Sequence, residues 1–180
     1  MSKLSQVGNV AQVLLEVRGN IAHINFDHVA ARNAMTAHMY QSLKTICESI
    51  AKDPRVRVTI LRGVGGKSFV SRSDIAQFAS FHDGQDGIRY EQGIDVYLAP
   101  LATLPIPTIA VIDGMAVGGL AIASCCDFRI STPGAKFGLP IAKTLGNCLS
   151  VGKIAWLADH LNINIVKRML LLTEMISAEE

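Results

Sequence analysis

The alternation of apolar and polar residues predicts two strands near the start of the chain. Apolar positions alternate over residues 13–17 and 21–26, and Gly19-Asn20 between them is a residue pair typical of tight hairpin turns. A further run, residues 56–60, places Val56, Val58 and Ile60 on one side of a strand by the same two-residue period. Residues 108–112, 128–131 and 135–137 complete the predicted strands.

Helical spacing separates these strands. Thr36 is a good N-cap for a helix that Pro54 ends, and its apolar stripe is Met39, Leu43, Ile46 and Ile50. The pattern predicts a short helix at residues 74–81, a flexible loop at 82–87, and further helices at residues 88–104, 151–160 and 163–172. Strands that alternate with crossover helices indicate a single α/β domain with a largely parallel sheet.

Composition narrows the class of protein. The chain has 180 residues, of which 49% are apolar and 18% charged, so it can bury a substantial core and is not globally disordered. Its net charge of +2 comes from scattered Lys and Arg, which predicts no nucleic-acid partner. The longest apolar region, residues 109–126, is broken by Asp113 and three glycines. We therefore expect no membrane span, and a cytoplasmic location.

The cysteines favour packing over cross-linking or metal binding. Cys47, Cys125, Cys126 and Cys148 show no Cys-x-x-Cys spacing, and two of them are adjacent. This usage is typical of small apolar side chains in a reducing compartment, and it predicts no metal site.

A nucleotide-binding loop is weakly supported. Gly66-Lys67-Ser68 follows a predicted strand, but a phosphate-binding loop needs a glycine five positions before Gly66, where Leu61 stands. The chain also has no G-x-G-x-x-G sequence. Its five histidines occur in no H-x-x-x-H or G-x-S-x-G context, and His82, next to Asp83, is the one with the most suggestive surroundings.

Two strand-to-helix turns carry the main candidate chemistry. One is residues 67–75, and the other is residues 114–123, where Gly118-Gly119 opens a short apolar helix. Neighbouring parallel strands bring such turns to one edge of the sheet, where ligands bind. One backbone N–H group from each turn could then hold a single carbonyl oxygen that becomes negative during reaction. Two ordinary turns that use small residues for packing explain the same residues equally well.

Several ordered segments, taken together, resemble the enoyl-CoA hydratase/isomerase, or crotonase, family. They are Arg32-Asn33-Ala34-Met35, then ILRGVGGKSFVSRSDI at 60–75, PTIAVIDGMAVGGLAIASCCDFRIS at 107–131, AKFGLPIAKTLG at 135–146 and LLLTEMISAEE at 170–180. The resemblance implies a crotonase-like spiral of β-β-α units that binds acyl-CoA thioesters. Coenzyme A enters as part of the substrate, and no further cofactor is implied.

The resemblance also assigns roles by position. The oxyanion-hole donors would be the N–H groups of Ser71 and Gly119, and the loop of Arg32 and Ala34 would run along the CoA chain. Further substrate contacts would come from Ser73, Asp74, Ile75, Gly118, Ile122, Pro140 and Ile141.

Two of these positions depart from the family pattern. Ile122 and Ile141 stand where hydratases of the family have the two glutamates that handle water and the α-proton. An isoleucine cannot transfer a proton, and acid–base help is worth about 10²–10⁴ in rate per group. The candidate substitutes are His82, Glu91, Asp95 and Asp113. Three readings stay open, namely a hydratase-type enzyme, an acyl-CoA-binding protein with impaired catalysis, and another family reaction such as thioester hydrolysis or decarboxylation.

The last residues suggest an interrupted element. Ser177 and Glu180 have the spacing of a capping box, which announces a helix where the chain stops. We therefore expect a shortened form of a longer protein, without the C-terminal helices that family members use to form trimers. A full-length form would be a homo-oligomer, either a trimer or a hexamer.

Overall fold

A five-stranded sheet forms one half of the molecule. The computed structural model describes residues 10–74, 78–79, 81–145 and 149–180. The strands are β1 (Gln12–Arg18), β2 (Ile21–Asp27), β3 (Val58–Gly63), β5 (Thr108–Ile112) and β7 (Phe128–Ser131), in the order β1-β2-β3-β5-β7. β1 and β2 are antiparallel, and the other neighbours are parallel. The predicted α/β class with a mainly parallel sheet is confirmed.

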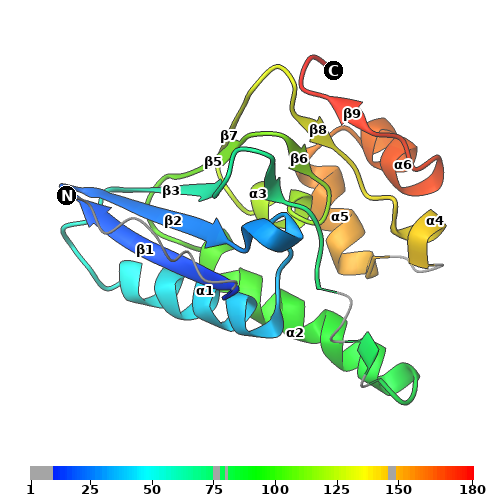
Figure 1. Ribbon diagram of the computed structural model, residues 1–180, viewed down its shortest axis with the longest axis horizontal. Helices are drawn as coiled ribbons and strands as arrows, with labels where there is room; N and C mark the ends of the chain where they lie inside the picture. Colours follow the sequence, from blue (N-terminus) through cyan, green and yellow to red (C-terminus); the bar gives the residue numbers. More distant parts are fainter. Residues whose placement is uncertain (1–9, 75–77, 80, 146–148) are drawn as a thin grey trace.

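Two long helices cover this sheet. α1 (Ala37–Ile50) and α2 (Gly84–Ala102) lie side by side along one face (Figure 1). Thr36 caps α1 as predicted, because its side chain accepts a hydrogen bond from the Met39 N–H group. Met39, Leu43 and Ile50 of the predicted stripe are buried, and Ile46 is partly buried against them.

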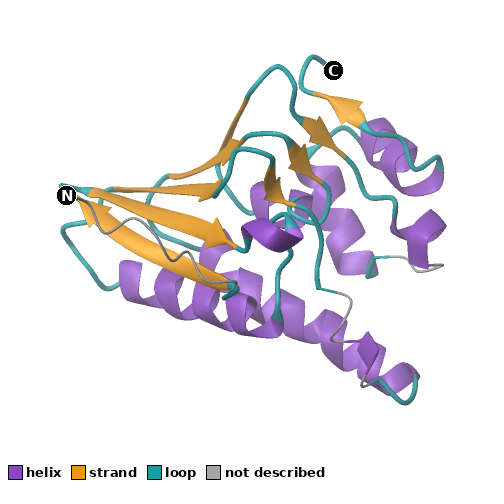
Figure 2. Cartoon of the chain, viewed as in Figure 1, coloured by secondary structure: helices purple, strands orange, loops and turns teal. Residues whose placement is uncertain are grey.

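A second, smaller sheet was not predicted as a sheet, although the strand predicted at residues 135–137 is confirmed as its strand Lys136–Phe137. Its strands are β4 (Ser68–Val70), β6 (Met115–Ala116), β8 (Lys136–Phe137) and β9 (Ile176–Ser177), and it lies with the C-terminal helices away from the β1–β2 hairpin (Figure 2). These strands have two or three residues each, which is too short for an alternation to be read. Ser177 lies in β9, although the Glu180 side chain does accept a hydrogen bond from the Ser177 N–H group at 3.4 Å.

The described residues also form several short or C-terminal elements. They are a 3-10 turn at Val29–Ala31, α3 (Leu120–Ser124), α4 (Ile141–Leu145), α5 (Val151–His160) and α6 (Ile163–Leu171). The predicted helix at 151–160 is confirmed with the same bounds, and that at 163–172 to within one residue. Half of the predicted helix at residues 74–81 lies outside the described residues, namely residues 75–77 and 80. No helix in the described ranges is long and apolar enough to cross a membrane.

The loop predicted at residues 82–87 is wrong, because α2 begins at Gly84. Asp83 accepts hydrogen bonds from the N–H groups of Gln85 and Asp86, and the Asp86 carboxylate accepts one from the Asp83 N–H group. This capping box satisfies the first free N–H donors of the helix. Its stabilisation outweighs the low helix propensity of the glycines in the first turn. The helix also continues through Pro100 and ends at Ala102, short of the predicted residue 104.

The third strand is displaced from its predicted position by two residues. The sequence pattern began it at Val56, but β3 starts at Val58. Val56 is buried in the preceding turn, where its N–H group donates to the Asp53 carbonyl oxygen. Val56 is therefore apolar because it is buried, although it is not paired with a neighbouring strand.

Candidate functional site

The two turns singled out from the sequence do meet. β3 and β5 are parallel neighbours, and the segments after them, β4 and β6, pair in parallel as well. Beyond these strands the Gly118 N–H group donates to the Ser71 carbonyl oxygen at 2.7 Å. Gly119 is the N-cap of α3, as expected for a glycine pair that opens a helix. The predicted convergence of the two turns is therefore present.

The two proposed oxyanion donors are not free in this structure. The Ser71 N–H group donates to the Arg32 carbonyl oxygen at 3.2 Å, and the Gly119 N–H group donates to the Val70 carbonyl oxygen at 2.9 Å. A thioester oxygen can bind both groups only after each exchanges its present acceptor. The oxyanion role of these residues therefore stays a prediction, and it requires a local rearrangement on ligand binding.

The Arg32 loop lies directly against this site. Arg32 and Asn33 adopt left-handed backbone conformations, with φ of 53° and 59°. The Asn33 side chain is buried and bridges three segments: it donates to the carbonyl oxygens of Val64 and Ser68, each at 2.9 Å, and accepts from the His28 N–H group at 3.0 Å. Sequence reasoning gave Asn33 no role of its own. The signal that could have identified Asn33 is its location between two strand ends and a tight turn.

Other predicted substrate contacts vary in exposure. Arg32 is exposed, Ala34 is buried, and Ser73, Asp74, Gly118, Pro140 and Ile141 are half-buried. Ser73 pairs with Met35 as an isolated parallel bridge, and the Asp74 N–H group donates to the Met35 carbonyl oxygen at 2.8 Å. Ile75 lies outside the described residues.

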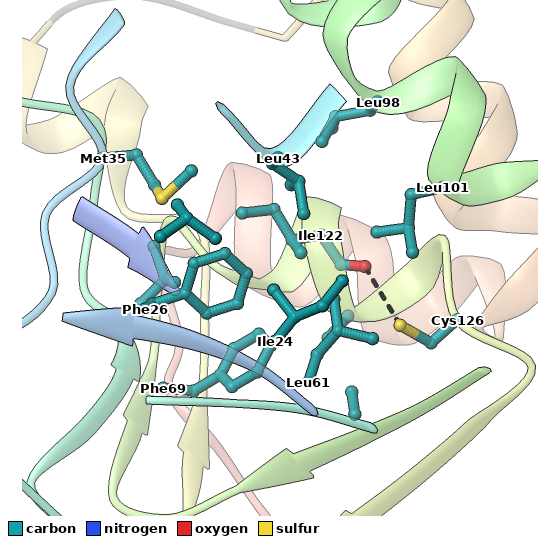
Figure 3. Packing of buried hydrophobic residues seen from close by; sticks show 14 of the residues in the cluster. Ile24, Phe26, Met35, Leu43, Leu61, Phe69, Leu98, Leu101, Ile122 and Cys126 are labelled. Carbon is teal, nitrogen blue, oxygen red and sulfur yellow. Dashed lines mark hydrogen bonds between the residues drawn. The ribbon is translucent and has the colours of Figure 1, made fainter. Parts of the chain in front are cut away.

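Ile122 belongs to the main hydrophobic core. It is 1% exposed and packs in the cluster that includes Leu43, Leu61 and Leu101 (Figure 3). Its carbonyl oxygen accepts a hydrogen bond from the Cys126 thiol (Figure 3). Ile122 thus contributes packing, and its side chain has no proton to exchange.

The candidate acid–base groups differ in their hydrogen-bond and ion-pair partners. Asp113 accepts a hydrogen bond from the Thr132 hydroxyl at 3.2 Å, and Asp95 forms an ion pair with Lys153. His82 is exposed just before α2, where its N–H group donates to the Asp86 carboxylate at 2.7 Å. Glu91 differs from these three because its Oε2 atom is buried without a hydrogen-bond partner among the described residues. Burial is the main reason that its pKa is raised.

The described cysteines are free thiols with suppressed acidity. Burial raises the pKa of Cys47, Cys125 and Cys126 to about 12 in each case. Only a thiolate reacts rapidly with alkylating agents. At pH 8, we expect iodoacetamide to modify these three residues at least tenfold more slowly in the native protein than in urea, as followed by peptide mass spectrometry. Rapid native labelling of Cys125 would contradict this prediction. Cys148 lies outside the described residues.

Comparison with known proteins identifies the family. The family model described as enoyl-CoA hydratase/isomerase matches residues 16–180, and the chain belongs to this family. An (E)-benzylidenesuccinyl-CoA hydratase from Thauera aromatica is 32% identical over 169 residues, which are 93% of this chain and 65% of the relative. A short-chain-enoyl-CoA hydratase from Clostridium acetobutylicum is 29% identical, with 93% and 64% covered.

Solved structures give the same result. A crystal structure described as an enoyl-CoA hydratase/carnithine racemase from Magnetospirillum magneticum has a TM-score of 0.88 and 30% sequence identity, and the match covers 93% of this chain and 63% of that one. Pseudomonas aeruginosa DspI has a TM-score of 0.85 at 26% identity, with 98% and 67% covered. The crotonase-like fold is therefore confirmed. The chain spans about 65% of the length of the first of these relatives.

Proposed function

We propose that this protein binds an acyl-CoA thioester and acts on its acyl chain, as an enzyme of the enoyl-CoA hydratase/isomerase type. The observation that carries the proposal is the family match over residues 16–180. The meeting of the 67–75 and 114–123 segments supports it, because it brings Ser71 and Gly119 close to one another. Their N–H groups would stabilise the negative thioester oxygen of an enolate, and one such donor is typically worth about 10²–10³ in rate.

Efficient hydration of the double bond is not expected. The two positions that would supply carboxylates hold Ile122, which is in the core, and Ile141. Acid–base groups contribute about 10²–10⁴ each, so their absence favours a reaction that needs fewer proton transfers. These isoleucines also support a second candidate function, in which the protein binds acyl-CoA without turning it over.

A ligand lacking only the carbonyl oxygen tests the proposed binding mode. We expect butanoyl-CoA to bind about tenfold more tightly than S-butyl-CoA, because the thioether cannot accept the two N–H hydrogen bonds. Isothermal titration calorimetry of both ligands measures the difference. Crotonyl-CoA and a 3-enoyl-CoA are then incubated with the protein, and the products are separated by chromatography. A hydrated product indicates hydration, a shifted double bond indicates isomerisation, and unchanged substrates indicate binding alone. Equal affinities for the two ligands would contradict the oxyanion contact, and no binding of either would contradict the proposed function.

A further inference from the structure

A cavity with mostly apolar walls lies between α2, α3 and α5. Its volume is about 270 Å³, and its walls include Leu98 of α2, Ala121 of α3 and Leu157 of α5. A cavity of about 150 Å³ can already hold a benzene molecule. This cavity therefore has room for an acyl chain of about six carbon atoms or more.

The cavity begins close to the candidate site. Gly119 is the N-cap of α3, and Ala121 in the first turn of that helix borders the cavity. Two residues span only about 3 Å along the axis of an α-helix. A thioester whose oxygen is bound by the Gly119 N–H group is therefore close enough for its acyl chain to reach the cavity.

Lys153 places a positive charge in the wall of this cavity. Its side chain is 11% exposed, whereas the side chain of its ion-pair partner Asp95 is 58% exposed. An ammonium group carries three N–H donors, and among the described residues the Asp95 carboxylate accepts the one hydrogen bond that the Lys153 ammonium group donates. A largely buried cation thus keeps donors for a further acceptor in the cavity.

The charges around Lys153 favour an anion over a cation as the ligand group. Water screens the exposed Asp95 carboxylate more than the buried ammonium group, and this carboxylate can turn into solvent. Lys153 also acts electrostatically on Glu91 and Cys125, but burial raises the pKa of both groups and so favours their uncharged forms. The first turn of α5, which includes the lining residue Gly152, adds the partial positive charge of a helix N-terminus. The positive charge of Lys153 therefore dominates inside the cavity.

We propose, on the basis of the proposed function, that Lys153 determines substrate specificity and that this protein takes acyl-CoA thioesters whose acyl group ends in a carboxylate. The carbon chain lies between Leu98 and Leu157, and the terminal carboxylate takes the place of Asp95 on the Lys153 ammonium group. Asp95 then turns into water, so that each charge keeps a partner or is hydrated. An apolar acyl group of equal size fills the same volume but accepts no hydrogen bond from Lys153.

Two ligands of equal shape test this specificity. Adipoyl-CoA and 6-methylheptanoyl-CoA differ only in whether the two end atoms of the acyl group are oxygen atoms or methyl groups. We expect the wild-type protein to bind adipoyl-CoA at least about tenfold more tightly, because hydrogen bonds between charged groups are the strong ones. Isothermal titration calorimetry measures both dissociation constants.

Lys153→Met assigns the preference to one residue, because methionine keeps an unbranched side chain and removes the charge. We expect its affinity for adipoyl-CoA to fall at least about tenfold and its affinity for 6-methylheptanoyl-CoA to change less than about threefold. Lys44→Met, which breaks the ion pair with Glu48 on α1, is the matched control and should keep the wild-type preference. Circular dichroism shows whether each variant is folded.

Gly152→Leu tests whether the acyl chain uses this cavity. A Cβ atom at Gly152 or at Gly134 would meet nothing within 4 Å, and Gly152 borders the cavity whereas Gly134 does not. Leucine is a better helix former than glycine, so α5 should be retained. We expect Gly152→Leu to lose at least about tenfold in affinity for both ligands through overfilling, and to keep its affinity for acetyl-CoA, whose acyl group is too short to fill the cavity. Gly134→Leu is the control and should bind all three ligands as the wild type does.

The outcomes separate this proposal from the one on which it rests. If the wild type bound 6-methylheptanoyl-CoA as tightly as adipoyl-CoA, or if Lys153→Met kept the preference for adipoyl-CoA, the role of Lys153 would be wrong and the proposed function would stand. Unchanged affinities in Gly152→Leu would show that the acyl chain lies elsewhere, with the same consequence. A failure of the wild type to bind any acyl-CoA would overturn the proposed function together with the role of Lys153.

Discussion

Asn33→Ala is expected to destabilise the protein by about 3 kcal/mol or more, because the loss of a buried bridging side chain leaves several groups without partners. Asn33 is 1% exposed, and its amide satisfies the Val64 and Ser68 carbonyl oxygens and the His28 N–H group. Each buried group left unpaired costs about 1–3 kcal/mol. Its backbone φ of 59° adds strain for alanine, since asparagine tolerates the left-handed region better. Urea unfolding followed by circular dichroism measures the effect.

Two further variants separate the reasons for this loss. Asn33→Asp keeps the shape and the acceptor but places an oxygen opposite two carbonyl oxygens, so we expect it to be destabilising as well. Asn20→Ala removes an exposed side-chain bond to the Arg55 carbonyl oxygen, and should cost no more than about 1 kcal/mol. If Asn33→Ala proved no worse than Asn20→Ala, the bridging role of Asn33 would be wrong.

The hydrogen bonds of the Asn33 side chain also affect the candidate site. The carbonyl oxygen of its neighbour Arg32 is the present acceptor of the Ser71 N–H group. The Asn33 bridge fixes this loop to the ends of β3 and β4, and so it sets where the Ser71 N–H group points. The Asn33 side chain, to which the sequence analysis gave no role, thus controls the surroundings of Ser71, which that analysis selected as a candidate.

The larger sheet could be predicted from the sequence because its strands are long enough to show a period. Residues 108–112 and 128–131 were located to the residue, and the Gly19 turn was identified from residue type. Of the small sheet only β8 was predicted, as a strand at residues 135–137, since β6 and β9 have two residues each and show no period. Their pairing depends on contacts between segments that are distant in sequence, which no local pattern records.

The candidate site was predicted in its location but not in its hydrogen bonding. Parallel neighbours β3 and β5 imply that the following turns share an edge, and this inference needs only the order of the elements. Which oxygen atoms accept hydrogen bonds from the Ser71 and Gly119 N–H groups depends on the positions of backbone atoms to within a fraction of an ångström. Glu91 could be named as a candidate from its type, but only the three-dimensional structure shows that its Oε2 atom is buried without a hydrogen-bond partner among the described residues.

Gly118→Ala is the second change with a large expected effect. A Cβ atom at this position would lie closer than 3.0 Å to three backbone atoms of Arg72. Backbone atoms cannot turn aside as the end of a flexible side chain can, so the two turns would have to separate. We expect a loss of stability of about 1–3 kcal/mol from overpacking. The hydrogen bond from the Gly118 N–H group to the Ser71 carbonyl oxygen would also be strained.

The same separation should weaken ligand binding, because it moves Ser71 and Gly119 apart. We expect at least a tenfold loss of butanoyl-CoA affinity in calorimetry, equivalent to about 1.4 kcal/mol. Gly134→Ala is the control: a Cβ atom there meets nothing within 4 Å, and stability should change by no more than about 0.5 kcal/mol. If Gly118→Ala bound butanoyl-CoA as tightly as Gly134→Ala does, close contact between the two turns would not be what holds the thioester. Measuring S-butyl-CoA with the same variant shows whether the affinity is lost at the two N–H donors. Only a ligand with a carbonyl oxygen should lose affinity when these donors move apart.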